Sequence, residues 1–246
     1  MPPSSSSSRA GEPPADSTTW SQLFSEIPER ELRQVAKLRR FGRGEIVFHQ
    51  DDPGDALHIV VSGRFAARVT TDLGEAATLA IYGPRQAFGL LSVLRPGLRR
   101  TATMMALEPA ETLLMTSAVF DRLRQEHPHL RSSVEQILVD QLAATNERLV
   151  EALYLPVQQR VRRRLAELAH TYGTPGATDV VIPLSQEHLA DLAGTTRETV
   201  NRVLRQEEEA GRVTLGRRQV TLHLGRPTER APRAGGAVSP ARRPAR

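Results

Sequence analysis

The sequence predicts an α+β chain: an antiparallel β sandwich or jelly roll, then a long helix, a helix-turn-helix and a β hairpin. Three observations predict this order. Many short β-prone runs, separated by Gly- or Pro-containing turns, lie between residues 45 and 115. The hydrophobic period becomes helical over residues 130–155. Between Leu184 and Gly211, two short helical patterns are joined by a tight turn.

Composition limits the class of protein. The 246 residues have room for two modest domains, and 39% hydrophobic residues suffice for their cores. No apolar run approaches the roughly 20 residues that cross a bilayer, and the segment MPPSSSSSRAGEPPADS lacks the apolar centre of a signal peptide. We therefore expect a cytoplasmic protein with no membrane partner. The absence of cysteine excludes disulfides, zinc–thiolate sites and cysteine-ligated iron–sulfur clusters.

The two ends of the chain differ from the rest in composition. Residues 1–18 are expected to be disordered, because five consecutive serines with Pro and Gly cannot bury a core. Residues 226–246 hold six arginines and one glutamate, so this segment carries as much charge as the whole chain, +5. This basic, disordered tail either adds non-specific attraction to phosphates or serves as a solubilising end.

Residues 19–129 are predicted to form the β domain. A short helix around Trp20 is broken at Ile27-Pro28, and a second helix is expected over residues 29–38. From Arg40 the hydrophobic period changes to two, which favours strands. The expected strands are Glu45–Phe48, Leu57–Val61, Phe65–Thr70, Ala76–Ile81, Arg100–Met105 and Thr112–Met115.

Residues 130–155 are predicted to form one long helix with a coiled-coil-like seam. The seam consists of Val134, Leu138, Leu142, Thr145, Leu149 and Ala152. We favour packing of this seam against a second copy of the chain, because a two-fold dimer suits a helix-turn-helix. The alternative is packing on the β domain of the same chain. Leu155-Pro156 interrupts the helical pattern and predicts a hinge.

Residues 156–225 are predicted to form a winged helix-turn-helix. A first helix, residues 157–172, carries four arginines that either contact phosphates or are solvated: Arg160, Arg162, Arg163 and Arg164. Ser185 and Thr196 are expected to cap the next two helices. The runs 212–215 and 219–224 are expected to pair as a hairpin whose tip residues, Arg217 and Arg218, rest on a DNA backbone.

The second helix of the helix-turn-helix has a polar face that suits a DNA major groove. Arg197, Glu198, Asn201 and Arg202 line its first turns. Arginine forks onto guanine O6 and N7, and glutamate accepts from cytosine N4. The alternative is an ordinary amphipathic helix with a solvated charged face.

The segment R-E-T-V-N-R at 197–202 resembles the recognition helix of the Crp/Fnr (catabolite activator) family of bacterial transcription regulators. S-Q-E-H-L-A-D-L-A-G at 185–194 matches the helix before it, and D-P-G-D-A-L-H-I-V-V-S-G-R at 52–64 is similar to the early strands of cyclic-nucleotide-binding domains. The resemblance covers residues 20–224. It implies a cyclic-nucleotide-binding-like β roll, a dimerisation helix and a winged helix-turn-helix.

The resemblance also implies a function without catalysis. Members are homodimeric regulators, so it implies double-stranded DNA with a palindromic site, a second copy of the chain and RNA polymerase as partners. Arg197, Glu198 and Arg202 correspond to the residues that read a TGTGA-like half-site, Arg202 and Glu198 reading bases and Arg197 a base or a phosphate.

A candidate effector site follows from the same resemblance. Phe88-Gly89-Leu90-Leu91, followed by Arg100-Thr101-Ala102, resembles the family's phosphate-binding cassette. The resemblance implies that Gly89, Arg100 and Thr101 hold a cyclic phosphate, and that Thr145 and Asn146 reach the adenine across the dimer seam.

Leu90 departs from this cassette. The members that bind cyclic AMP have a glutamate there, which accepts the ribose 2′-OH, and leucine cannot accept a hydrogen bond. Three options stay open: cyclic AMP or another cyclic nucleotide bound weakly, a different effector, or a vestigial pocket in an effector-independent regulator. No cofactor is therefore certain.

One pattern suggests a different class of protein. His127-Pro128-His129 has a spacing that a metal-dependent jelly-roll enzyme can use, although it falls at a predicted helix boundary. No nucleophile–base motif, P-loop or pair of carboxylates accompanies it. We expect no metal site and no catalytic residues, and metal analysis of the purified protein separates the two classes.

Overall fold

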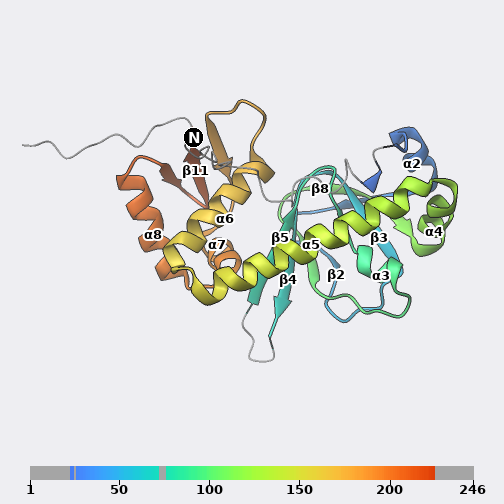
Figure 1. Cartoon of the computed structure of the whole chain (residues 1–246). Helices are drawn as coiled ribbons and strands as arrows, with labels where there is room; N and C mark the ends of the chain where they lie inside the picture. The colour runs from blue at the N-terminus through green and yellow to red at the C-terminus, as the bar shows by residue number, and fades with distance from the viewer. Residues whose placement is uncertain (1–22, 25, 72–75, 225–246) are drawn as a thin grey trace, which may run out of the picture.

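The computed structural model describes residues 23–24, 26–71 and 76–224. The segments expected to be disordered (1–18 and 226–246), Trp20 and the loop at 72–75 lie outside the described residues. A β domain and a smaller α/β domain are connected by one long helix that runs from one to the other (Figure 1). None of the helices over the described residues is both long and apolar enough to cross a membrane.

The β domain consists of two antiparallel four-stranded sheets, in the orders β1-β8-β3-β6 and β2-β7-β4-β5. The strands of the first sheet are β1 (Lys37–Phe41), β8 (Ala110–Thr116), β3 (Ala56–Ser62) and β6 (Ala87–Phe88). Those of the second are β2 (Ile46–Phe48), β7 (Thr103–Ala106), β4 (Phe65–Thr70) and β5 (Ala76–Tyr82). Phe41, Phe65 and Phe88 fill the space between the sheets, as expected for a jelly roll.

Four helices cover the outer face of the first sheet. They are α2 (Glu29–Val35), α3 (Leu90–Leu94), α4 (Ser117–Glu126) and the first half of α5 (Pro128–Tyr154). Leu57, Leu113 and Met115 of the sheet pack against Phe120 and Leu130 of the helices. The sequence did not predict α4, which begins at a side-chain cap in which Thr116 accepts from the Val119 N–H.

Two expected boundaries in the β domain are wrong. The helix expected over 29–38 ends at Val35, and Lys37–Phe41 instead forms β1, paired with Leu114–Ala110 of β8. Pairing with a sheet edge outweighs local helix propensity there, because it buries Phe41. The strand expected from Arg100 begins at Thr103, because the Arg100 N–H and C=O bond to Asp52 and Asp51 rather than to a ladder.

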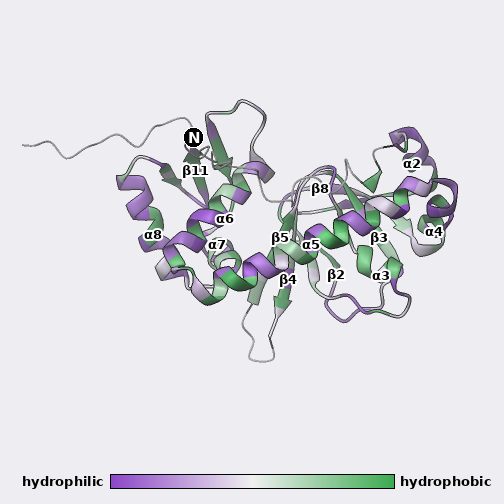
Figure 2. Cartoon of the chain, viewed as in Figure 1, coloured by the Kyte–Doolittle hydropathy of each residue, from purple (hydrophilic) through white to green (hydrophobic). Residues whose placement is uncertain are grey.

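The long helix α5 divides into two halves with different surroundings. Val134 of the predicted seam is buried in the β domain, and Leu138 packs beside it. From Leu142 onwards the seam is uncovered within one chain: Leu142 is 63% exposed and Leu149 58%. Figure 2 shows hydrophobic residues along this part of α5. The first half therefore packs on its own domain, and the second presents an apolar face.

The C-terminal domain contains the predicted helices and hairpin. It consists of α6 (Val157–Tyr172), β9 (Asp179–Ile182), α7 (Gln186–Ala193), α8 (Arg197–Glu209), β10 (Val213–Gly216) and β11 (Gln219–His223). Strand β9, which the sequence did not predict, pairs with β11 and makes the hairpin a three-stranded sheet. Its Val180 and Ile182 join the core formed by the three helices.

Candidate nucleic-acid interface and effector cavity

The turn between α7 and α8 has the predicted local geometry. The Ser185 hydroxyl accepts from the His188 N–H at 3.3 Å, and the Thr196 hydroxyl accepts from the Thr199 N–H at 3.3 Å, so each residue caps its helix. Gly194 ends α7 in the left-handed region, with φ of 59°. These three residues fix the angle at which α8 leaves α7.

The outer face of α8 presents the predicted polar side chains. Arg197, Glu198 and Arg202 are exposed, whereas Val200, Val203 and Leu204 on the opposite face are buried. Asn201 is half-buried, and its side-chain oxygen accepts from the Gln186 amide of α7 at 3.3 Å. The Glu198 carboxylate accepts hydrogen bonds from its own backbone N–H and from Thr196. These bonds lower the pKa of Glu198, so the side chain stays ionised and acts as an acceptor. The face therefore combines charged donors and acceptors suited to base edges.

A buried carboxylate supports this face from behind. Glu207 of α8 is 3% exposed and accepts from Arg162 of α6 at 2.7 Å and from Arg212 at 2.5 Å. Burial opposes its ionisation, but these two hydrogen bonds outweigh burial and lower the pKa of Glu207. One ionised side chain thus ties α6, α8 and the start of β10 together. The sequence did not predict this support, because a glutamate among three consecutive glutamates gives no sign of burial.

The other arginines that the sequence suggested as DNA contacts fall into two groups. Arg217 and Arg218 are exposed at the hairpin tip, where Arg218 has φ of 60°. The four arginines of α6 instead donate to the chain itself. Arg162 bonds to Glu207, Arg163 and Arg164 bond to Glu151, and Arg160 bonds to the carbonyls of Ala152 and Gly194. Arg164 is buried, whereas the side chains of Arg162 and Arg163 stay 46% and 54% exposed. Bonds within the chain thus add to the two alternatives from the sequence, phosphate contact and solvation, and do not decide between them.

Most of the predicted effector residues line one cavity. The cavity has a volume of about 590 Å³ and lies between β4, β5, the α3 segment and α5. Its lining includes five of the six predicted residues, Gly89, Leu90, Arg100, Thr101 and Thr145. Asn146 does not line it and is exposed on another face of α5. The predicted cassette residues and Thr145 of α5 therefore line one cavity within a single chain, whereas Asn146 does not contribute to it.

Arg100 is a buried cation bonded to neutral groups. It is 6% exposed, donates to the Ala56 carbonyl at 2.8 Å and lies 3.4 Å from the Ser92 hydroxyl. Its guanidinium also stacks over Phe48 at 4.1 Å. Burial lowers the pKa of Arg100, and the charges of Asp55 and Asp52 oppose that effect only in part. Among the described residues its Nε is buried without a partner, so the site suits an added anion.

Glycine is required on both sides of this arginine. A Cβ at Gly89 would lie 2.5 Å from the Arg100 Nη1, and Gly89 has φ of +81°. A Cβ at Gly54 would lie 2.9 Å from the Arg100 Nε. Larger residues at either position would push the guanidinium away.

Leu90 and Thr145 differ in how they face the cavity. Leu90 is the first residue of α3 and is 9% exposed, because its side chain belongs to the β-domain core. Thr145 is exposed within one chain and its hydroxyl donates to the Gln141 carbonyl at 2.7 Å. The wall at Leu90 is thus apolar, whereas the α5 side offers a hydroxyl.

The histidines of the His127-Pro128-His129 pattern bond to two different carboxylates. His127 Nε2 lies 3.1 Å from Glu31, and His129 Nδ1 lies 2.9 Å from Glu26. Over the part of the chain that the structure describes, no group of three or more His, Asp or Glu side chains could hold a metal ion. The pairs instead join the start of α5 to the N-terminal helical segment.

Both domains of the chain match models of known protein families. Residues 38–127 match the model of the cyclic nucleotide-binding domain, and residues 159–224 match that of the Crp-like helix-turn-helix domain. The chain is also similar in structure to the c-di-GMP responsive global regulator CLP of Xanthomonas campestris, with a TM-score of 0.66 and 22% identity, over 79% of this chain and 97% of that one. That likeness concerns the fold.

Two relatives are similar over most of the chain. A CRP-like cAMP-activated global transcriptional regulator of Mycobacterium tuberculosis is 32% identical over 184 residues, which is 74% of this chain and 82% of the relative. A cyclic AMP receptor protein of Thermus thermophilus is 32% identical over 178 residues, which is 72% of this chain and 80% of the relative. The exposed polar face of α8, the cavity at Arg100 and these matches agree: this chain belongs to the Crp/Fnr family of DNA-binding transcription regulators, which are not enzymes.

Proposed function

We propose that the protein binds a palindromic DNA site as a homodimer and regulates transcription through RNA polymerase. The observation that carries the DNA-binding part is the outer face of α8, where Arg197, Glu198 and Arg202 project from a helix fixed by its Thr196 cap and a buried glutamate. We assign base contacts to Glu198, Asn201 and Arg202. Arg197 then contacts a base or a phosphate, and Arg217 and Arg218 contact the DNA backbone.

The dimer part of the proposal rests on the second half of α5. Its uncovered apolar side chains include Leu142, Leu149, Val150 and Leu153, each more than half exposed. Monomers rarely leave such a row open to water, and a second α5 in a parallel coiled coil would cover it. Thr145 and Asn146 lie on this half, so a partner helix would pass beside the cavity.

We further propose that the cavity binds a small anionic effector of the cyclic-nucleotide type. A buried Arg100 with an unpaired Nε supports the anion, and the relatives named as cAMP-activated or as a cyclic AMP receptor support the nucleotide. Leu90 provides no acceptor for a ribose hydroxyl. Loss of a charged hydrogen bond, about 1.5–3 kcal/mol, weakens binding roughly 10- to 150-fold.

The test is fluorescence anisotropy of a palindromic TGTGA-type duplex, titrated with the purified protein against a scrambled duplex, with and without cyclic AMP. Specific binding that requires cyclic AMP supports the whole proposal. Specific binding that ignores the nucleotide supports DNA recognition and indicates an effector-independent regulator, the alternative that Leu90 favours. Equal binding to both duplexes would contradict the assigned base contacts.

A further inference from the structure

A pair of side-chain amides connects α7 to the outer face of α8. Gln186 is the first residue of α7, directly after the Ser185 cap, and its Nε2 donates to Oδ1 of Asn201 at 3.3 Å. Both side chains are half-buried, so water competes less for this bond than it would on an open surface. The contact therefore determines which end of the Asn201 amide is left for a ligand.

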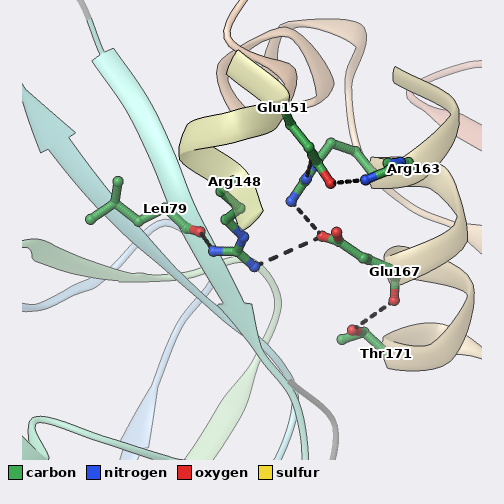
Figure 3. A network of polar contacts seen from close by, with 7 residues as sticks. Leu79, Arg148, Glu151, Arg163, Glu167 and Thr171 are labelled. Atoms are coloured by element: carbon green, nitrogen blue, oxygen red, sulfur yellow. Dashed lines mark hydrogen bonds and ion pairs between the residues drawn. The ribbon is translucent and has the colours of Figure 1, made fainter. Parts of the chain in front are cut away.

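Two buried carboxylates elsewhere in the chain form bonds of a different kind. Glu151 of α5 accepts from Arg163 of α6 (Figure 3), and Glu207 of α8 accepts from Arg162. A carboxylate only accepts and a guanidinium only donates, so the direction of these bonds is fixed. An amide carries both an acceptor and two N–H donors. The direction of a bond between two amides therefore decides what each of them can still offer.

Asn201 lies in the middle of the polar face of α8. Arg197 is one turn before it and Arg205 one turn after it, and both are exposed. With the Asn201 oxygen bonded to Gln186, the two N–H groups on its Nδ2 remain. This nitrogen bonds to none of the described residues, and it is not one of the buried atoms that lack a partner. Water therefore reaches Nδ2 in the free protein, and a DNA base can replace that water.

The four bases differ in what they present to such a donor in the major groove. Guanine presents the acceptors N7 and O6, and thymine presents the acceptor O4, whereas cytosine presents only its N4 amino donor. Adenine presents the acceptor N7 beside its N6 amino donor, and asparagine selects adenine by bonding to both at once. An Asn201 side chain whose oxygen is occupied cannot accept from an amino group. The usual asparagine contact with adenine is therefore lost.

We propose that Gln186 makes Asn201 a donor-only reader of DNA, so that each half-site carries a base with a keto oxygen, guanine or thymine, opposite Asn201. Adenine and cytosine are rejected there. This inference rests on the proposed function and deepens it, because it names the class of base that one contact selects. Gln186 is a positioning residue, since it acts on the DNA through Asn201. One neutral hydrogen bond of this kind changes affinity about 2- to 10-fold.

Competition anisotropy with the full chain and saturating cyclic AMP tests this selection. The probe is a palindromic TGTGA-type duplex, and the competitors carry each of the four bases in turn at every half-site position, changed symmetrically. Asn201→Ala identifies the position that Asn201 reads, because discrimination should disappear there. In the unchanged protein we expect guanine and thymine at this position to bind about 2- to 10-fold more tightly than adenine and cytosine. Adenine as the best base there would overturn the inference.

Two variants of Gln186 change the direction of the amide bond. Gln186→Glu has nearly the same shape but can only accept, so Asn201 must donate to it and turn its oxygen towards the base. The preference should then reverse to the amino bases, adenine and cytosine. Gln186→Ala frees both ends of the Asn201 amide, so the preference should shift to adenine. If these variants only weaken binding to every duplex equally, the contact is merely structural and the inference is overturned.

The control for added charge is Gln206→Glu, at an exposed position of α8 that bonds to Gln158. It should leave the order of the four bases unchanged, and circular dichroism confirms that each variant is folded. If Asn201→Ala ranks the bases as the unchanged protein does while Arg202→Ala does not, the inference is overturned and the proposed function stands. If no duplex is preferred to a scrambled one, the proposed function fails and the inference fails with it.

Discussion

The outer face of α8 and the cavity at Arg100 show two ways of building a proposed binding surface. On α8 the polar side chains point outward, and their positions follow from helical spacing and the Thr196 cap. In the cavity, Gly89, Arg100 and Thr145 come from a turn, a loop and a distant helix. The first surface depends on local geometry, and the second depends on how the domains are folded together.

The two surfaces also treat charge differently. Arg197 and Arg202 are exposed to water, so their guanidinium groups keep their hydration and pay little desolvation free energy. Arg100 is enclosed and depends on the Ala56 carbonyl, the Ser92 hydroxyl and the Phe48 ring. A change on the exposed outer face of α8 should therefore affect binding alone, whereas a change in the cavity or in the support behind α8 should also affect folding.

Loss of the support behind α8 should have the largest effect. Glu207→Ala removes two charged hydrogen bonds worth about 1.5–3 kcal/mol each, and because Arg162 and Arg212 are partly exposed and can turn to water, the expected loss is about 3 kcal/mol of unfolding free energy. Urea unfolding followed by circular dichroism measures this change. Glu209→Ala, an exposed glutamate two residues later, is the control and should be nearly neutral. Similar small effects for both variants would show that Glu207 is not a structural support.

Restoring an acceptor in the cavity should have the next largest effect. Leu90→Glu is expected to strengthen cyclic-AMP binding roughly 10- to 150-fold, because a charged hydrogen bond to the ribose is worth about 1.5–3 kcal/mol. Isothermal titration calorimetry measures the affinity. Leu91→Glu, at a neighbouring position that is 37% exposed, adds the same charge elsewhere. An unchanged affinity in Leu90→Glu would reject the alignment of the cassette.

These contrasts explain what the sequence could predict. The caps at Ser185 and Thr196, the turn at Gly194 and the apolar face of α8 are local, so spacing alone located them. The family motif located Gly89, Arg100 and Thr101, but no local pattern reveals that Leu90 belongs to a core or that Asn146 faces away from the cavity. Strand β1, strand β9 and the buried glutamates were missed because their partners are distant in sequence.

Removing one base contact should have a smaller effect than removing the support for the helix. Arg202→Ala is expected to weaken specific binding by about 1–3 kcal/mol and to relax selectivity at one base pair. Anisotropy titrations against duplexes with each base pair changed in turn measure both quantities, and the unfolding free energy should not change because Arg202 is exposed. A uniform loss across all duplexes would make Arg202 a phosphate contact.

A pH-dependent effect concerns the interior of the β domain, at His58. This residue is 4% exposed, and its ring stacks on Phe88 with centroids 5.1 Å apart. Burial, followed by the charges of Arg100 and Arg39, lowers the pKa of His58 from 6.5 to about 3. The unfolded chain therefore takes up a proton at a pH where the folded chain does not. The stability contributed by the neutral ring is complete above pH 6.5 and is lost as the pH falls towards about 3.

The slope of this loss is about 1.4 kcal/mol of unfolding free energy per pH unit for a single site. Urea unfolding of the unchanged protein and of His58→Asn, which lacks the titrating ring, is measured between pH 6.5 and pH 4. The difference between the two unfolding free energies gives the slope due to His58. The folded protein also loses stability as Glu151 and Glu207 become protonated at low pH, since the fold lowers the pKa values of both carboxylates. Their contribution is common to both proteins, so it cancels in the difference. Parallel pH profiles for the two proteins would mean that the pKa of His58 is the same in the folded and unfolded chains, which would contradict the cost of protonating this buried ring.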